Sequence, residues 1–159
     1  MIFLVIYFCP RCGRSFDENS RPVSCDCGTP LKSTVDWSDL EIDPGARGMA
    51  RYSSVLPPLD LSISMGEGWT PLLLSRSGGP YYKLEYLFPT GSFKDRGSVL
   101  VMTEAKNQGQ ESVVQDSSGN AGASIAAYAA RCGIRATVIV PRDTTEAKRR
   151  QIELYGATL

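Results

Sequence analysis

The stretch that decides the fold is residues 112–140, which reads SVVQDSSGNAGASIAAYAARCGIRATVIV. Residues 112–116 favour a short strand, and residues 120–131 form an alanine-rich run that a glycine at 133 would end as a helix. Residues 135–140 are a β-branched run, the clearest strand in the chain. A strand, a helix and a second strand with short connections predict a parallel α/β unit.

The sequence on either side continues this alternation. A helix is expected over residues 93–108, capped by the hydroxyl of Thr90 or Ser92 and ended by Gly109. A last helix is expected from the capping-box residues 143–146 to about 155, followed by the start of a strand at 157–159. Upstream, residues 72–74 and 81–86 flank a Gly-Gly-Pro turn and predict a hairpin. The predicted fold class is α/β, an incomplete three-layer parallel sheet with helices on both faces.

Composition limits the possible functions. The 159 residues contain 17 Lys and Arg against 17 Asp and Glu, so no net charge attracts nucleic acid or an acidic membrane. Histidine is absent, which excludes Ser-His-Asp and Cys-His catalysis and imidazole metal sites. The apolar start is shorter than the roughly 20 residues that span a bilayer, and it lacks the features of a signal peptide. We therefore expect a cytoplasmic protein with small-molecule or subunit partners, and neither nucleic acid nor membrane.

Four of the five cysteines form two close pairs, Cys9 with Cys12 and Cys25 with Cys27. Two such pairs around a short loop predict one tetrahedral zinc site, which would stabilise a segment too short to fold by apolar burial alone. Two disulfides or free thiols are the alternatives, and disulfides are disfavoured in the cytosol. We expect a zinc-ribbon-like module over residues 1–34, a linker over 35–65, and a catalytic part over 66–159.

Two loops carry residues suited to chemistry. Lys94 stands where a turn leads into a helix, and a lysine becomes a nucleophile when desolvation near a helix start and a neighbour such as Arg96 favour its neutral form. Residues 116–122 would present backbone N–H groups and hydroxyls to an anion at a helix N-terminus. Taken separately, Lys94 is more simply explained as a solvated helix lysine, as most lysines are, and this loop as an ordinary N-cap. Neither nucleotide-binding glycine pattern is present.

Together these motifs resemble a known family. Residues 85–97 (EYLFPTGSFKDRG), residues 66–72 (GEGWTPL), the loop SSGNAGAS at 117–124 and the cysteine module are similar to the tryptophan-synthase-β-like pyridoxal phosphate enzymes, and most similar to threonine synthases. The resemblance implies that Lys94 holds pyridoxal 5′-phosphate as a Schiff base and moves protons. It also implies that Asn120 binds the ring hydroxyl, and that Ser117, Ser118 and Gly119 hold the carboxylate of an amino-acid substrate. The implied activity converts O-phosphohomoserine and water to threonine and phosphate, in an enzyme that is expected to be a homo-oligomer (dimer).

The sequence also departs from the family pattern. Neither a glycine-rich loop for the cofactor phosphate nor a polar partner for the pyridine nitrogen is recognised after Lys94, and Phe88 stands where a polar residue often precedes Pro-Thr-Gly-Ser. We therefore expect a truncated chain whose catalytic competence is in question. The rival hypotheses are a cysteine synthase or threonine dehydratase, a non-catalytic zinc-clip remnant, and a zinc-ribbon nucleic-acid protein.

Overall fold

The computed structural model describes residues 5–17, 23–35, 37–117 and 119–159. The chain divides into two compact units, one formed by Met1–Asp43 and Tyr52–Pro57 and the other by Pro44–Arg51 and Pro58–Leu159. No helix within the described residues has the length and apolar character needed to cross a membrane.

The first unit is built on a small antiparallel sheet. Strand β1 (Val5–Phe8) pairs on one side with β2 (Ser15–Phe16) and on the other with β3 (Lys32–Val35), followed by the 3-10 helix η2 (Trp37–Asp39). The turn after β1 and the turn before β3 carry the two cysteine pairs. This sheet therefore supports the cysteine turns.

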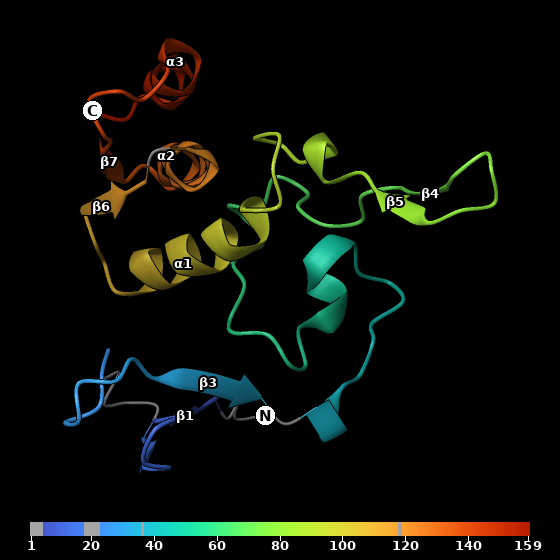
Figure 1. Ribbon diagram of the computed structural model, residues 1–159, viewed down its shortest axis with the longest axis vertical. Coiled ribbons are helices and arrows are strands. Elements are labelled where there is room, and N and C mark those ends of the chain that lie inside the picture. Colours follow the sequence, from blue (N-terminus) through green and yellow to red (C-terminus); the bar gives the residue numbers. More distant parts are fainter. Residues whose placement is uncertain (1–4, 18–22, 36, 118) are drawn as a thin grey trace. The chain divides into compact units, whose positions relative to one another are not determined.

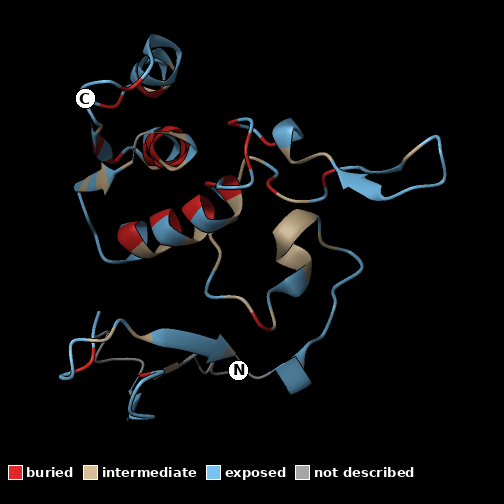
Figure 2. Cartoon of the chain, in the orientation of Figure 1, coloured by how far each residue is buried: buried red, intermediate tan, exposed pale blue. Residues whose placement is uncertain are grey.

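The second unit begins with turns and short elements. The first four residues of the 3-10 helix η3 (Gly48–Tyr52) belong to this unit. Strand β4 (Leu72–Leu74) pairs with β5 (Tyr81–Lys83) as an antiparallel hairpin before the 3-10 helix η4 (Glu85–Leu87). The hairpin predicted from the Gly-Gly-Pro turn is confirmed. Figure 2 shows both of its strands exposed, and the side chains of all six strand residues share that exposure.

The rest of the second unit alternates helices and strands. Helix α1 (Asp95–Asn107) is followed by β6 (Ser112–Asp116), α2 (Asn120–Cys132), β7 (Arg135–Ile139) and α3 (Glu146–Leu154). Strands β6 and β7 pair in parallel, and a single parallel bridge joins Thr137 to Thr158. Helix α2 lies between α1 and α3, and both pack against it (Figure 1). The predicted parallel α/β unit is thus confirmed over this region.

The two faces of the parallel sheet differ in burial. Ala136 and Val138 are buried on the face that α2 covers. Val114 and Ile139, on the opposite face, are 69% and 56% exposed. The described residues therefore show a partial α/β structure with one sheet face covered. A second helical layer stays a prediction, which parallel sheets favour because both of their faces are normally buried.

The core of the second unit is centred on α2. Figure 2 shows this helix buried around most of its circumference, and every residue from Gly122 to Ala129 is buried. Val99 and Met102 of α1 and Ile152 of α3 are buried against the same cluster. Small residues on α2 let its neighbours approach closely. A Cβ built on Gly122 would come within 2.8 Å of a Val138 methyl, so this position accepts no larger residue without movement.

The N-terminal ends of α1 and α3 differ from the predicted ones. Helix α1 has Lys94 as its N-cap, and α3 has Thr145; neither makes a side-chain capping hydrogen bond. The expected hydroxyl cap on α1 and the capping box on α3 are therefore wrong. The C-terminal end of α2 is as predicted, since Gly133 follows it with φ of 70° in the left-handed region.

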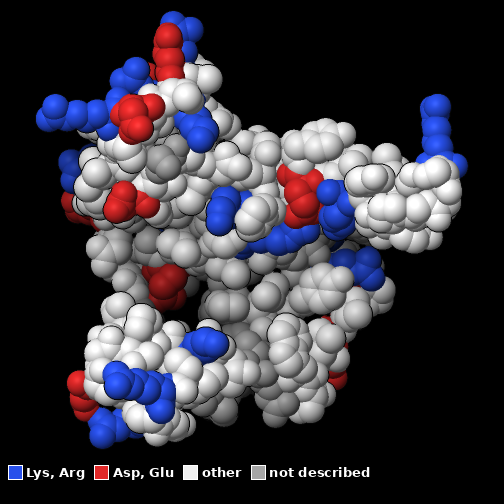
Figure 3. All heavy atoms as spheres, in the orientation of Figure 1, with Lys and Arg blue, Asp and Glu red and all other residues white. Residues whose placement is uncertain are grey.

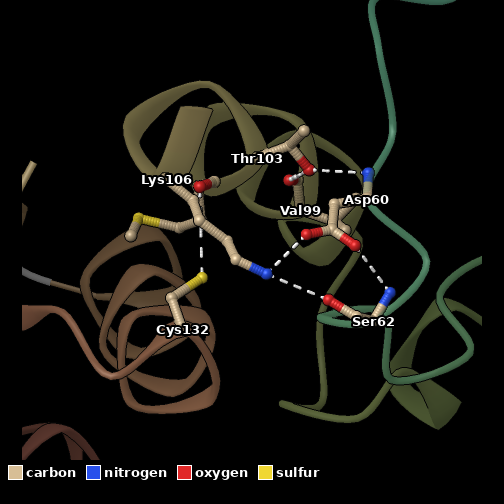
Figure 4. A network of polar contacts seen from close by, with 7 residues as sticks. Asp60, Ser62, Val99, Thr103, Lys106 and Cys132 are labelled. Carbon is tan, nitrogen blue, oxygen red and sulfur yellow. Dashed lines mark hydrogen bonds and ion pairs between the residues drawn. The ribbon is translucent and has the colours of Figure 1, made fainter. Parts of the chain in front are cut away.

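A polar network ties the segment before the Gly66 motif to α1 (Figure 4). Lys106 donates to the Asp60 carboxylate at 2.6 Å and to the Ser62 hydroxyl at 3.0 Å, and the Asp60 backbone N–H donates to Thr103 at 3.1 Å. The bond from Lys106, followed by bonds from the Ser62 hydroxyl and the Ser62 backbone N–H, lowers the pKa of Asp60 from its ordinary 3.8 to about 2. The carboxylate is therefore charged over the whole neutral range.

Candidate functional site

The loop that carries Lys94 is a tight turn feeding directly into α1. The backbone N–H of Gly91 donates to the Phe88 carbonyl at 2.8 Å, and Gly91 has φ of 82°, a conformation that favours glycine. Lys94 follows as the N-cap of α1 with its side chain exposed, its Nζ 4.7 Å from the centroid of the Phe93 ring. Within the described residues, the Lys94 amine makes no hydrogen bond or ion pair. It is open to a ligand, but the chain described here does not supply the desolvation expected from the sequence.

Arg96 does not face Lys94 as an isolated charge. Its guanidinium makes two bonds to the Glu85 carboxylate, at 3.1 and 3.2 Å, and lies 4.5 Å from the centroid of the Phe88 ring. Thr70 donates its hydroxyl to the same carboxylate at 2.6 Å. Through Glu85, Arg96 therefore connects Thr70 to the start of α1, and its charge has a structural role here.

Asp95 anchors the lysine loop from inside the protein. Its side chain is fully buried and accepts hydrogen bonds from the Thr90 backbone N–H at 2.9 Å, from the Thr90 hydroxyl, and from the Ser124 hydroxyl of α2 at 2.6 Å. Thr90 thus binds the first residue of α1 through its side chain. This bond holds the turn closed in place of the expected N-cap.

The Gly66 motif is anchored in a similar way. Glu67 is 2% exposed and accepts hydrogen bonds from the Ser64 hydroxyl at 2.7 Å, the Met65 backbone N–H at 2.9 Å and the Tyr128 hydroxyl of α2 at 2.7 Å. Burial of Tyr128, and then its bond to Glu67, raise the pKa of the phenol well above its usual range. Tyr128 is therefore protonated around neutral pH and donates its hydroxyl to Glu67 there.

A cavity of about 500 Å³ lies beside this motif. Its apolar lining includes Met49, Leu59 and Trp69, and its lining residues include neither Lys94 nor Asn120. Trp69 has φ of 52°, unusual for an aromatic residue, and lies under the Arg51 guanidinium at 5.3 Å. The cavity is therefore separate from the two loops predicted to carry the chemistry.

The second predicted loop joins β6 to α2. The Ser117 backbone N–H donates to the Ile139 carbonyl at 3.1 Å, and the Gly119 N–H donates to the Ser117 hydroxyl at 3.3 Å. Ser118, also predicted to hold substrate, lies outside the described residues. Asn120 opens α2 with an exposed side chain that makes no hydrogen bond within the described part of the chain.

Helix α3 contacts both loops through side chains that the sequence reasoning missed. Gln151 donates to the Thr90 carbonyl at 2.9 Å, and the Lys148 amine lies 3.8 Å from where a Cβ on Gly119 would stand. The available signal was their spacing, since residues three apart share one face of a helix. That spacing alone does not identify what the face contacts.

The residues present fit the cofactor that the resemblance implies. Lys94 offers an unbonded amine and Asn120 an unbonded amide, and the Asp95–Ser124 hydrogen bond connects the two segments that carry them. The hydroxyl of Ser92, two residues before Lys94, is buried with no partner among the described residues. Gly119 leaves its surroundings open, since a Cβ there would contact only the Lys148 amine. An amine can react with an aldehyde and an amide can hydrogen-bond a ring hydroxyl, so the chemistry of these two side chains suits that cofactor.

The four cysteines of the first unit converge as predicted. Their sulfur atoms all lie within 4.8 Å of one another, with Cys9 to Cys27 and Cys12 to Cys25 each 3.6 Å apart. These separations exceed the 2.05 Å of a disulfide and match the roughly 3.8 Å between thiolates around tetrahedral zinc. The cluster can therefore hold a metal ion with four sulfur ligands.

Each cysteine pair lies on a turn closed by a backbone hydrogen bond to the carbonyl of its first cysteine. Gly13 N–H donates to the Cys9 carbonyl at 2.9 Å, and Gly28 N–H donates to the Cys25 carbonyl at 2.8 Å. Burial raises the pKa of the Cys9 thiol, but bonds from the backbone of Cys12 and Arg11 outweigh it and lower that pKa to about 6. Arg14 and Asp26 form an ion pair between the two turns. Both turns therefore aim their sulfurs at one point, as a metal site requires.

Comparison with known proteins assigns the family. The pattern described as "Pyridoxal-phosphate dependent enzyme" matches residues 63–159, well over half of the chain. The chain belongs to the pyridoxal-phosphate dependent enzyme family. The match begins before the Gly66 motif and includes both loops, so the assignment covers every residue predicted to meet the cofactor. It does not include the cysteine cluster.

Two curated relatives of the chain are threonine synthases. The chain is 36% identical to a threonine synthase of Methanocaldococcus jannaschii over 94% of its own length and 41% of that protein. It is 40% identical to a threonine synthase of Halalkalibacterium halodurans over 70% of its length and 34% of that protein. A crystal structure of O-ureido-L-serine synthase matches 64% of the chain and 35% of that chain, with a TM-score of 0.56 and 33% identity. The chain thus spans about two fifths or less of these relatives.

Proposed function

We propose that this chain provides the cofactor-lysine part of a threonine synthase. The proposed reaction is conversion of O-phosphohomoserine and water to threonine and phosphate. The observation that carries it is the unbonded Lys94 amine, presented by a loop that α2 and α3 both anchor, in a chain whose relatives include threonine synthases. Pyridoxal phosphate, when bound, supplies an electron sink for the carbanions of such a reaction.

We propose a role for each of the predicted site residues in the two loops. Lys94 Nζ holds the cofactor and moves protons between substrate carbons, since a neutral amine acts as both base and, once protonated, acid. The Asn120 amide binds the ring hydroxyl. Ser117, Ser118 and Gly119 orient the carboxylate of the amino-acid substrate at the N-terminus of α2, where the helix dipole favours negative charge.

The relatives are longer than this chain, and their additional residues are relevant to the complete activity. We propose that the cofactor-phosphate loop, the partner of the pyridine nitrogen and the second helical layer of the sheet correspond to parts of the relatives outside the matched two fifths. The domain organisation proposed is a zinc-ribbon-like module at 1–34, a linker at 35–65 and a catalytic part at 66–159, in a cytoplasmic homodimer. Figure 3 shows basic and acidic side chains in several separate groups on the face in view, and the absence of a nucleic-acid partner stays a prediction.

The test is whether pyridoxal phosphate attaches at Lys94. The full chain is incubated with the cofactor and reduced with borohydride, and the labelled peptide is located by mass spectrometry. We expect label on Lys94, none in Lys94→Ala, and unchanged labelling in Lys32→Ala, which removes an exposed lysine of the other unit. Label spread over surface lysines, with no preference for Lys94, would contradict the proposal.

We also propose that the cysteine cluster binds structural zinc. Purified protein should contain about one zinc per chain, since four thiolates satisfy one tetrahedral ion. Cys12→Ser should lose most of the metal, whereas Cys132→Ser, which changes a cysteine outside the cluster, should keep it. Full zinc content in Cys12→Ser would count against the site.

A second candidate is a different replacement reaction of the same family. The structural match to O-ureido-L-serine synthase favours it, because that enzyme's name indicates chemistry on a serine-type substrate. O-phosphohomoserine and O-acetylserine are each assayed on the chain incubated with pyridoxal phosphate. Phosphate release from O-phosphohomoserine supports threonine synthase, and turnover of O-acetylserine alone supports the alternative.

A further inference from the structure

The Asp95 carboxylate is buried without a cation. None of the ion pairs among the described residues involves Asp95, and the neighbouring Arg96 is bound to Glu85 instead. Burying a carboxylate is costly unless hydrogen bonds replace its water. Within the part of the chain that the structure describes, the donors that do so come from Thr90 and Ser124. An apolar side chain would avoid burying the charge but would leave the Thr90 N–H and the Ser124 hydroxyl without this acceptor.

The two ends of the Asp95–Ser124 bond stand next to the two residues proposed to hold the cofactor. Asp95 directly follows Lys94 in the chain. Ser124 lies four residues after Asn120 on α2, so the two share one face of the helix one turn apart. A single 2.6 Å hydrogen bond therefore connects the segment carrying the amine to the helix carrying the amide.

The bond is held from both sides. Ser124 is fully buried, and its hydroxyl also lies 2.7 Å from the Ser98 hydroxyl of α1. On the other side, Thr90 is fixed both by Asp95 and by Gln151 of α3. The lysine turn has little freedom to move relative to α2 while the Asp95–Ser124 bond is intact.

We propose that Asp95 and Ser124 are a positioning pair that sets the spacing between Lys94 Nζ and the Asn120 amide. The inference rests on the proposed function, and it adds two residues that never contact the cofactor. Its physical basis is that a ligand gripped at two points needs both at fixed separation, and misplacement by about 1 Å is costly. Loss of the bond lets the Lys94 turn shift while each gripping group stays chemically intact.

The matched variants are Ser124→Ala and Ser98→Ala. Both remove one hydroxyl from the same buried cluster, but only Ser124→Ala removes a donor to Asp95. We expect a larger fall in the melting temperature of Ser124→Ala, because it removes both hydrogen bonds and leaves Asp95 one donor short. Affinity for pyridoxal phosphate should fall about tenfold in Ser124→Ala and less than about twofold in Ser98→Ala. A tenfold fall corresponds to the free energy of about one buried hydrogen bond to a charged group.

Two readouts separate positioning from general loosening. Affinity is measured by absorbance titration, and the fraction of label on Lys94 by mass spectrometry after borohydride reduction. Asn120→Ala combined with Ser124→Ala should weaken binding by less than the product of the single effects, because both changes remove the same two-point grip. Asp95→Asn retains one carbonyl acceptor, so its affinity for pyridoxal phosphate should lie between those of wild type and Ser124→Ala. It provides a second test if Ser124→Ala does not fold.

The outcomes distinguish the two proposals. If wild type labels at Lys94 and Ser124→Ala binds and labels no worse than Ser98→Ala, the positioning pair is refuted while the proposed function stands. Independent, multiplicative effects of Asn120→Ala and Ser124→Ala would also refute it. If wild type itself shows no preference for Lys94, the proposed function fails and the positioning pair fails with it.

Discussion

Gly122 is the position where a single methyl group should most clearly perturb the second unit. An ideal Cβ there would meet a methyl of Val138 at 2.8 Å, the backbone carbonyl of Ser117 at 3.1 Å and a methyl of Ile152 at 3.4 Å. Val138 is fully buried and has no space to retreat, and the Ser117 carbonyl belongs to the loop that opens α2. Gly122→Ala must therefore push α2 away from β7 or displace the loop.

The size of the effect is a difference of two terms. Replacing glycine by alanine inside a helix gains about 1 kcal/mol from helix propensity. Overpacking a close-packed core costs about 1 to 3 kcal/mol. We expect a net loss of about 1 kcal/mol for Gly122→Ala, which corresponds to a fall of roughly 4 to 8 °C in melting temperature for a domain of this size.

Gly97 in the first turn of α1 is the matched control. A Cβ there meets nothing within 4 Å, so Gly97→Ala should keep the propensity gain and stabilise the protein by up to about 1 kcal/mol. Urea unfolding followed by circular dichroism measures both variants, and the two midpoints should move in opposite directions. Stabilisation of the protein by Gly122→Ala, equal to that by Gly97→Ala, would refute the close approach of α2 to β7.

Three further predictions concern other contacts. Asp60 has a folded pKa of about 2, below its ordinary 3.8, so the stability it contributes is complete above pH 3.8 and is lost as pH falls towards 2. The difference in urea midpoint between wild type and Asp60→Asn should therefore shrink between pH 5 and pH 2.5, and a constant difference would contradict the Lys106 contact. Tyr128→Phe leaves Glu67 one donor short and should cost about 1 to 3 kcal/mol, measured by the same unfolding assay; no loss would show that this bond contributes nothing. Chelation of zinc should make the first unit sensitive to proteolysis, while the amides of α2 in the second unit stay protected from hydrogen exchange. Loss of protection in both units at once would contradict the idea that zinc stabilises the first unit alone.

The sequence predicted the elements that depend on local periodicity. The hairpin of β4 and β5 followed from a turn signal between two apolar runs, and the β6–α2–β7 unit from its alternation and the glycine after α2. The cysteine cluster followed from spacing, because close cysteine pairs on tight turns have few other arrangements. Each of these features is encoded within about 30 residues.

Contacts between distant segments could not be predicted in the same way. Thr90 was expected to cap α1, but its hydroxyl binds the buried Asp95, whose carboxylate is also bound by a residue 29 positions away. Gln151 binds the Thr90 carbonyl across 61 positions. No local pattern distinguishes a buried, bonded aspartate from a solvated one, so these partners become visible only when α2 and α3 are placed against the loop.

Helix α2 has an alanine-rich sequence, yet it positions two motifs of the candidate site. Its run of alanines predicts a buried helix and no chemistry, yet Ser124 and Tyr128 stand four residues apart and so face the same direction. Ser124 binds Asp95 beside Lys94, and Tyr128 binds Glu67 in the Gly66 motif. Two motifs almost 30 residues apart in sequence are thus oriented by adjacent turns of one helix, which itself begins at Asn120. Because the alanines between them let α1, α3 and β7 pack closely, the helix has little freedom to rotate, and its two hydroxyls hold both motifs at fixed positions relative to the proposed cofactor ligand.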